Sequence, residues 1–374
     1  MIVMNIKLDN FFAFRDFVMN FSYPKKIVKS YISTEHLPGL PRFRYKKLLI
    51  LMGSNASGKT SLGQMFNHIF NLMMRKQTER LVKSVCDMSR EARAELDFVP
   101  STTPFMLCRI EVKISPVKGA SEPEITARFR RTRLKATDSY ESASKRIDAE
   151  EGEYSDYIDE LRDIPVIGYF FSYPMDVHPD TVPSYGNGKY REILEKVLRV
   201  LDAGIENVEA VADVKDAYKI HMVNGQDVLI QEGHIVNTSL LSSGTKAGIG
   251  IADILTAMKG HMCGFYYCDE RFSYVQSEIE KAVLSLMLEL LGESEQLIFT
   301  THNTEMLTLP LPRHSYAFLK KTVTETGSEL LCVNASEYLK RNTGSLRRAV
   351  ENDIFSVLPD THEINRIAGK RPHA

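Results

Sequence analysis

Residues 53 to 60 have the spacing of a loop that wraps around phosphate. Gly53 and Gly58 let the backbone curve so that its N–H groups point inward at an anion, and Lys59 can reach the β- and γ-phosphates of a nucleotide. In such a loop the hydroxyl of Thr60 is a ligand for Mg²⁺. The pattern therefore predicts a site for ATP and Mg²⁺. The expected phosphate cradle comprises Gly53, Ser54, Asn55, Ala56, Ser57, Gly58, Lys59, Thr60 and Ser61.

An acidic pair, Asp269 and Glu270, ends a second apolar segment much further along the chain. Asp269 is suited to holding Mg²⁺, directly or through water, and Glu270 to orienting and deprotonating an attacking water. Such a pair alone is more often a solvated strand end. Its position after a phosphate-binding loop and before another apolar segment, Gln296–Phe299, favours phosphoryl transfer instead.

Two further polar segments adjoin predicted elements. The segment Leu241-Ser242-Ser243-Gly244-Thr245 opens a predicted helix, and a Ser/Gly turn there offers N–H groups and a positive helix dipole to an anion. The simpler interpretation is that Ser242 only caps the helix. His302 lies just after the apolar segment that begins at Gln296, and no other histidine of the chain has such a setting.

The order of these segments resembles the ABC-type ATPase heads of the SMC, Rad50, RecF and OLD group. The resemblance covers most of the chain in short motifs, and Asn10–Phe14 fits the usual end of that group's first strand. It implies that Ser242 and the backbone of Gly244 contact the γ-phosphate of an ATP held by a second subunit. It also implies that His302 senses the γ-phosphate and helps to position water. The expected catalytic residues are then Glu270, His302 and Lys59, and the expected metal ligands are Thr60 and Asp269.

Two positions depart from the pattern of that group. The segment after the acidic pair, Ser273–Gln276, keeps a serine but has Gln276 where that group commonly has an acidic residue that takes part in subunit coupling. The group also places a glutamine between the two lobes to complete the Mg²⁺ shell, yet no glutamine lies between Gln77 and Gln226. Three substitutes remain open: Asp176, Ser172 and a water.

The elements that must position these residues predict an α/β fold. The continuous apolar run Lys47–Met52 is typical of a buried parallel strand, and the apolar spacing from Thr60 to about Val85 is helical. Alternating residues over 2–9 and 17–21 predict a hairpin. We therefore expect a P-loop NTPase, an ABC ATPase head with a mainly parallel core sheet, an N-terminal antiparallel sheet and a helical lobe.

The remaining pattern predicts one two-lobed head over residues 1–374. The P-loop lobe occupies 1–100, and antiparallel strands with a charged insertion and a helical segment occupy 101–235. The segment 236–374 holds the turn Leu241–Thr245, called the signature turn below, together with the acidic pair and His302. Further strands are expected over 105–114, 124–134, 166–172 and 265–268, further helices over 190–208, 240–259 and 277–291, a loop over 23–45, and short helices or partly disordered chain over 136–163.

Composition narrows the class of protein. A net charge of −1 makes no global electrostatic demand for nucleic acid or a membrane surface. No apolar run approaches the length of a membrane span, and the first strand carries Lys7 and Asp9, unlike a secretory signal. The five cysteines include no CxxC pair, so we expect buried free thiols in a reducing cytoplasm.

Basic residues cluster in two regions. Arg128, Arg130, Arg131, Arg133 and Lys135 lie on one predicted strand, and with Arg42, Arg44, Lys46 and Lys47 they are candidates for a DNA or RNA track. The alternative is a solvated sheet face balanced by the acidic stretch 148–160. A second set near the C-terminus either docks a partner or, as we favour, keeps a tail soluble: Arg341, Arg347, Arg348, Arg366, Lys370 and Arg371.

Three functions fit these features. The first is a Mg²⁺-dependent ATPase that forms a homodimer or higher oligomer with ATP sandwiched between heads, and that drives or gates a separate effector. Because the chain shows no coiled-coil arm and only a short stretch after His302, it resembles stand-alone ATPases of bacterial anti-phage defence, by fold-level analogy. The second is a slow-turnover, ATP-bound scaffold that holds a toxin or nuclease partner inactive. The third is a RecF-like ATPase of DNA repair.

Overall fold

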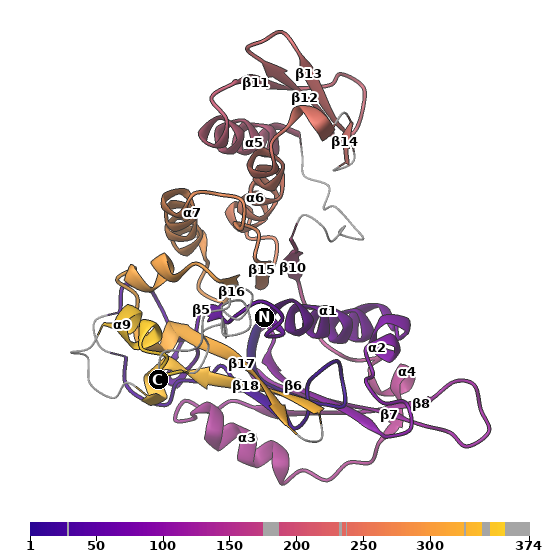
Figure 1. The fold of residues 1–374 in the computed structure, drawn as a ribbon. Coiled ribbons are helices and arrows are strands. Elements are labelled where there is room, and N and C mark those ends of the chain that lie inside the picture. The colour runs from indigo at the N-terminus through magenta and orange to yellow at the C-terminus, as the bar shows by residue number, and fades with distance from the viewer. Residues whose placement is uncertain are drawn as a thin grey trace, which may run out of the picture.

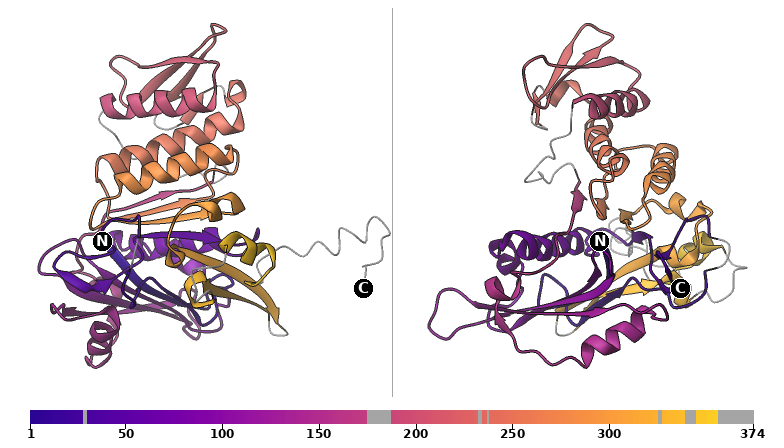
Figure 2. Two further views of the ribbon diagram at one scale, coloured as in Figure 1. Left: turned by 90° about the vertical axis from the view of Figure 1, so that its left-hand side faces the viewer. Right: turned by 180° about the vertical axis from the view of Figure 1, so that it is seen from behind.

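The computed structural model describes residues 1–27, 30–174, 187–231, 234–236, 238–324, 327–338 and 345–355. The molecule has two tiers, which are clearest in Figures 1 and 2. The lower tier holds two six-stranded sheets, and the upper tier holds three helices beneath a small four-stranded sheet. The three strands that lead into Gly53, Glu270 and His302 lie where the tiers meet.

The central sheet has the strand order β10-β15-β16-β5-β17-β18. The first five strands are parallel and β18 pairs antiparallel with β17. Every residue of β5, β15 and β16 is buried, as their continuous apolar runs predict. Because parallel strands have their carboxyl ends at one edge, the loops after these three strands lie close together. The bounds are β5 Leu48–Met52, β10 Tyr169–Ser172, β15 Phe265–Asp269, β16 Gln296–Thr301, β17 Tyr316–Thr324 and β18 Gly327–Asn334.

The second six-stranded sheet is antiparallel, with the order β2-β1-β6-β7-β8-β9. Helix α1 (Lys59–Arg75) shares one hydrophobic core with both large sheets through residues such as Phe66 and Phe70. Helix α3 (Tyr140–Asp148) covers the other face through Tyr140 and Ile147. The strands are β1 Ile2–Asp9, β2 Phe17–Asn20, β6 Ala92–Val99, β7 Met106–Ser115, β8 Glu124–Arg133 and β9 Ser155–Asp156.

The upper tier packs α6 (Ser243–Lys259) against α5 (Asn187–Leu201) and α7 (Ser277–Leu290), under a sheet of order β11-β12-β13-β14. Its strands are β11 Ile205–Ala210, β12 Ala217–Met222, β13 Asp227–Gln231 and β14 His234–Val236. The other short elements are α2 Glu79–Lys83, α4 Tyr157–Glu160, α8 Ala335–Tyr338, α9 Leu346–Glu351, the hairpin β3 His36–Leu37 and β4 Leu40–Arg44, and the 3₁₀ turns η1 Thr238–Leu240, η2 Thr304–Thr308 and η3 Arg313–Ser315.

Several predicted elements need correction. The helix expected over 60–85 ends at Arg75, because Lys76 adopts a left-handed conformation whose N–H caps the carbonyls of Asn71 and Leu72. The helix expected over 190–208 ends at Leu201 and is followed by β11. The expected loop 23–45 contains β3 and β4, and the sequence pattern missed β6 and the whole upper sheet.

The structure also bears on the expectations for the cysteines and for membrane spans. All five cysteines are free, but Cys86 is exposed and only Cys108 and Cys268 are fully buried. In the described part of the chain, no helix combines the length and the apolar character that a membrane crossing needs.

Candidate active site

The loop between β5 and α1 folds tightly around the side chain of Lys59. Its Nζ donates hydrogen bonds to the carbonyl oxygens of Gly53 at 2.8 Å and Ser54 at 3.0 Å, and only 3% of the side chain is exposed. A Cβ on Gly53 would lie 2.6 Å from the carbonyl oxygen of Leu319, and Gly58 has a φ of 93°. Glycine is therefore required at both positions, as a loop that wraps phosphate demands.

Helix α1 is also tied to the strand that carries the acidic pair. The hydroxyl of Tyr267, buried in β15, donates a 2.6 Å hydrogen bond to the carbonyl oxygen of Lys59. Tyr267 also packs closely on Gly63, where a Cβ would meet its ring at 2.6 Å. The first turn of α1 and the end of β15 are thus held in fixed relation.

Lys59 and Glu270 form an ion pair of 3.0 Å. The pair joins the first residue of α1 to the residue just after β15, so two predicted catalytic groups of one chain meet in one place. Glu270 has a left-handed backbone, φ 39°, and its carbonyl oxygen accepts hydrogen bonds from the N–H and hydroxyl of Ser273. This turn directs the Glu270 carboxylate towards the phosphate-binding loop.

Asp269 is fully buried beside the same loop. Its Oδ1 accepts a 2.6 Å hydrogen bond from the hydroxyl of Thr300, whereas its Oδ2 has no hydrogen-bond partner among the described residues. Burial raises the pKa of the Asp269 carboxyl, and the hydroxyls of Thr300 and Thr60 together with the charge of Lys59 oppose that shift. A buried carboxylate oxygen without a donor, next to a threonine hydroxyl, fits the oxygen ligands that Mg²⁺ takes.

Thr300 is a site residue that the sequence analysis missed. Besides its bond to Asp269, its Oγ1 accepts a 3.0 Å hydrogen bond from the backbone N–H of Glu270. One hydroxyl thus fixes both members of the acidic pair from the neighbouring strand β16. A threonine at the end of a buried strand was the available signal, but threonine is common in strands for packing reasons alone.

His302 follows β16 and has 52% of its side chain exposed. Its Nδ1 lies 3.9 Å from Oε1 of Glu270, beyond hydrogen-bond length. The residues on either side are held firmly, because the buried carboxylate of Glu280 accepts from Thr301 at 2.8 Å and Asn303 at 2.6 Å. An open pocket of ≈ 260 Å³ lies here; its lining includes Glu270, Ser273, Val275, Ser277, Glu280 and His302.

The turn that contains Ser242 and Gly244 forms the N-terminus of α6. Ser242 Oγ accepts a 3.1 Å hydrogen bond from the N–H of Thr245, so the capping interpretation holds locally. A Cβ on Gly244 would lie 2.9 Å from the carbonyl oxygen of Tyr274. These contacts stay within the turn and the segment after the acidic pair. Within one chain the structure does not bring Ser242 or Gly244 into the Lys59 and Glu270 cluster.

The structure places one of the two residues that could substitute for the missing glutamine. Ser172 ends β10, is buried and pairs with Cys268 in the adjacent strand. Asp176 lies outside the described residues. The hydroxyl of Tyr173, which follows Ser172, accepts a 3.1 Å hydrogen bond from Asn67 of α1. Tyr173 and Asn67 were not among the predicted site residues.

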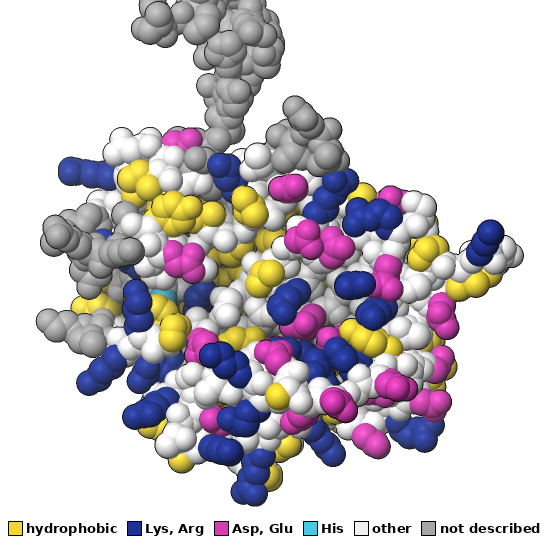
Figure 3. Space-filling model, turned by 90° about the horizontal axis from the view of Figure 1, so that it is seen from below, with side chains coloured by type: hydrophobic (Ala, Val, Ile, Leu, Met, Phe, Trp, Pro, Cys, Tyr) yellow, Lys and Arg dark blue, Asp and Glu magenta, His cyan; other side chains and the backbone are white. Residues whose placement is uncertain are grey.

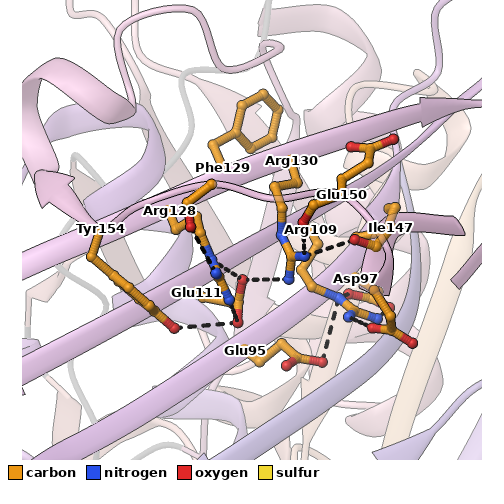
Figure 4. Close-up of polar contacts among 12 residues, drawn as sticks. Glu95, Asp97, Arg109, Glu111, Arg128, Phe129, Arg130, Ile147, Glu150 and Tyr154 are labelled. Atoms are coloured by element: carbon orange, nitrogen blue, oxygen red, sulfur yellow. Dashed lines mark hydrogen bonds and ion pairs between the residues drawn. The ribbon is translucent and has the colours of Figure 1, made fainter. Parts of the chain in front are cut away.

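The basic cluster on β8 is engaged within the protein. Arg128 and Arg130 both pair with Glu111 of β7, at 2.8 Å and 2.7 Å, and Figure 4 shows the three side chains converging. Beside them Arg109 makes two hydrogen bonds to the fully buried Asp97. On the face seen in Figure 3, blue and magenta side chains are interspersed. Arg128 and Arg130 are therefore not a free cationic track, which corrects that expectation for these two residues.

Similarity to solved structures identifies the fold. The chain resembles an SMC head bound to the C-terminal winged-helix domain of ScpA, at TM-score 0.50 and 14% identity over 90% of this chain and 99% of that one. It resembles equally an SMC head with an extended coiled coil bound to the C-terminal domain of ScpA, from Pyrococcus furiosus, at TM-score 0.50 and 10% identity over 91% and 98%. The recombination mediator RecF with ATP scores lower, 0.41 at 12% identity over 89% and 96%.

No protein-family model matches the chain, and no curated protein matches its sequence. The chain thus has the fold of the SMC head, the fold that the motif order predicted. At these identities the similarity defines the architecture and not the chemistry.

Proposed function

We propose that this protein is a Mg²⁺-dependent ATPase whose heads associate face to face around ATP. The observation that carries the proposal is the Lys59–Glu270 ion pair beside Asp269, which is buried and has one carboxylate oxygen without a partner among the described residues. These residues lie at the carboxyl-end edge of the parallel strands β5 and β15, which flank β16. A cation that can bind phosphate (Lys59), a carboxylate that can bind a metal (Asp269) and a candidate base (Glu270) therefore lie at one edge of the sheet. This is the set of groups that phosphoryl transfer to water requires.

Each residue has a defined task in this proposal. Backbone N–H groups of 53–60 and Nζ of Lys59 bind the phosphates, which requires Lys59 to exchange Glu270 for the nucleotide. Released from Lys59, the Glu270 carboxylate orients a water and accepts its proton. Thr60 and Asp269 would hold Mg²⁺, which would supply neutralisation of the phosphate charge. His302, which is half exposed beside Glu270, helps to position this water.

The second half of each site comes from a partner copy in this proposal. Ser242 and Gly244 lie at the N-terminus of a 17-residue helix, where N–H groups and the dipole favour an anion. Their contacts within the chain leave the Ser242 side chain exposed. A γ-phosphate bound by the P-loop of one copy would meet this turn of the other copy.

Turnover and trapping test the proposal. We expect wild-type protein to hydrolyse ATP, Lys59→Ala to lose ATP binding, and Glu270→Gln to bind ATP but to lose about 10²-fold or more in kcat. ATP should convert Glu270→Gln into a stable dimer, measured by light scattering after size exclusion. If Glu270→Gln hydrolyses ATP at the wild-type rate, the assignment of the base is wrong.

A slow-turnover scaffold is the second candidate. It is favoured by the exposed His302 at 3.9 Å from Glu270 and by the absence of glutamine from 78–225. Both SMC heads were solved with a domain of ScpA bound, so a head of this fold can carry a protein partner, and we extend this by analogy to an effector in anti-phage defence. A wild-type ATP complex that persists for hours would favour the scaffold over the motor.

A further inference from the structure

Helix α6 has a glycine, Gly250, in its interior. Glycine there costs about 1 kcal/mol relative to alanine, so a packing reason is expected. The reason is Arg271: a Cβ on Gly250 would lie 1.9 Å from Nη2 and 2.2 Å from Cζ of its guanidinium. The guanidinium of Arg271 lies directly against the backbone of α6, in space that any side chain would fill.

Arg271 connects three parts of the molecule from this position. Its Nη1 donates a 2.7 Å hydrogen bond to the carbonyl oxygen of Tyr173, just beyond β10 of the central sheet. Its charge stabilises the carboxylate of Asp253, one turn along α6, whose pKa burial raises to about 6. Arg271 itself follows Glu270 directly. The Arg271 side chain therefore connects the central sheet, the turn at Glu270 and helix α6.

The same segment contacts α6 a second time. Gly244, at the helix N-terminus, approaches the carbonyl oxygen of Tyr274 so closely that a Cβ would lie 2.9 Å from it. The segment Arg271–Tyr274 thus rests on α6 at two glycines. The segment follows Glu270, which has a left-handed backbone and whose carbonyl oxygen accepts a hydrogen bond from the Ser273 hydroxyl. The backbone of Glu270 is thereby connected to α6 through this segment.

We propose that Arg271 is a positioning residue, which locks the backbone of Glu270 to helix α6 through the space left by Gly250. When the Ser242–Gly244 turn docks on the nucleotide of a partner copy, α6 and Arg271 set the place of the Glu270 carboxylate. The inference rests on the proposed ATPase function. It assigns a task to a charged residue outside the proposed nucleotide and metal ligands.

The test adds a methyl group rather than removing a charge. Gly250→Ala places its Cβ where the guanidinium lies, and we expect the flexible arginine to be displaced while α6, now with alanine, stays folded. Misplacing the base by about 1 Å should lower kcat by about 10- to 100-fold. KM for ATP should change less than about twofold because the P-loop is untouched. Gly260→Ala is the matched control, since its Cβ would meet only flexible Met262 and the helix end.

A double-mutant cycle separates positioning from general damage. Arg271→Met should lower kcat as Gly250→Ala does, and Gly250→Ala on top of Arg271→Met should cost little more, because the guanidinium is already gone. Independent, multiplying losses would overturn the proposal, as would wild-type kcat in Gly250→Ala. Equal binding of a fluorescent ATP analogue shows that each variant is folded. A wild type that fails to hydrolyse ATP contradicts the proposed function instead.

Discussion

Thr300 fixes two atoms whose positions the proposed reaction depends on. Its hydroxyl donates to Asp269 Oδ1 and accepts from the N–H of Glu270. Replacing it with valine keeps the shape and the strand preference but removes both bonds, and a second oxygen of Asp269 then loses its donor. Hydrogen bonds to charged groups contribute about 1.5–3 kcal/mol each. We expect Thr300→Val to lower kcat about tenfold in an ATPase assay at saturating Mg²⁺.

The conservative variant provides the control for this residue. Thr300→Ser keeps the hydroxyl, so we expect it to retain most of the activity. Comparable losses in Thr300→Ser and Thr300→Val would show that the packing of the methyl group, and not the two hydrogen bonds, is what matters at this position.

At the residue scale, spacing alone predicted some positions and could not predict others. Lys59, Asp269 and Glu270 follow from fixed offsets within local motifs, because each motif is one strand or helix end. Thr300 and Arg271 act across elements that are distant in the sequence, and their contacts depend on which strands are neighbours. The sequence left open whether Arg128 and Arg130 form a cationic track or a charge-balanced sheet face for the same reason, because Glu111 faces them from the adjacent strand.

Helix α7 controls the loop that carries His302. Glu280 is buried and accepts hydrogen bonds from Thr301 and Asn303, the two neighbours of the histidine. Removing the carboxylate leaves the Thr301 hydroxyl and the Asn303 amide without their acceptor, and each unsatisfied donor costs about 1–3 kcal/mol of folding free energy. We expect Glu280→Ala to lower the free energy of unfolding by about 2–4 kcal/mol in a urea titration. Glu278→Ala, on the exposed face of the same first turn, should change it by about 0.5 kcal/mol or less.

Helix α1 should respond to acid through His68. Burial, and secondarily the charge of Arg80, lowers the pKa of His68 to about 4, below its ordinary value of 6.5. The unfolded chain therefore binds the proton more readily than the folded chain. Stability from this group is fully present above pH 6.5 and is lost as the pH falls towards 4. At pH 5 the loss amounts to at most about 2 kcal/mol, since the side chain is partly exposed.

A variant that cannot titrate isolates this effect. We expect wild-type protein to lose up to about 2 kcal/mol more than His68→Gln between pH 7.5 and pH 5, measured by chemical denaturation at both values. Other titrating groups are common to the two proteins and cancel in the difference. Identical pH profiles would mean that His68 gains no burial on folding.

At the element scale, the buried strands were the most predictable features. Continuous apolar runs predicted β5, β15 and β16, and the motifs at their ends then fixed the parallel sheet. The helix over 60–85 was predicted too long because Lys76, which ends α1, has no sequence signal of a helix end. The upper sheet was missed because its strands are short and because β11 buries Ile205 and Val208, whose spacing of three residues also fits a helix.

At the scale of the whole molecule, the proposed site is divided between two tiers. Lys59 begins helix α1 of the lower tier, and Asp269 and Glu270 lie at the end of strand β15. Ser242 and Gly244 lie at the start of helix α6 of the upper tier. The proposal therefore separates residues that must act within one chain from those that act on a partner. Lys59 and Glu270 are 3.0 Å apart in one chain, so under the proposal they should serve the same nucleotide. Ser242 should serve the nucleotide of the other copy.

Mixing two inactive variants tests this division. Lys59→Ala lacks a working P-loop and Ser242→Arg blocks the signature turn, so neither should hydrolyse ATP alone. A mixed dimer has one site that combines the intact P-loop of one chain with the intact turn of the other. With random pairing, half of the dimers are mixed and half of their sites are intact, so an equimolar mixture should recover about a quarter of wild-type turnover.

The control mixture uses two lesions on the same side of the site. Lys59→Ala with Glu270→Gln should recover nothing, because the only chain with a working P-loop then lacks its base. Recovery in this control, or none with Ser242→Arg while ATP still dimerises Glu270→Gln, would contradict a site shared between copies. Activity recovered only in the Ser242→Arg mixture would show that the turn at the start of α6 acts in trans, because no arrangement within one chain can produce that asymmetry.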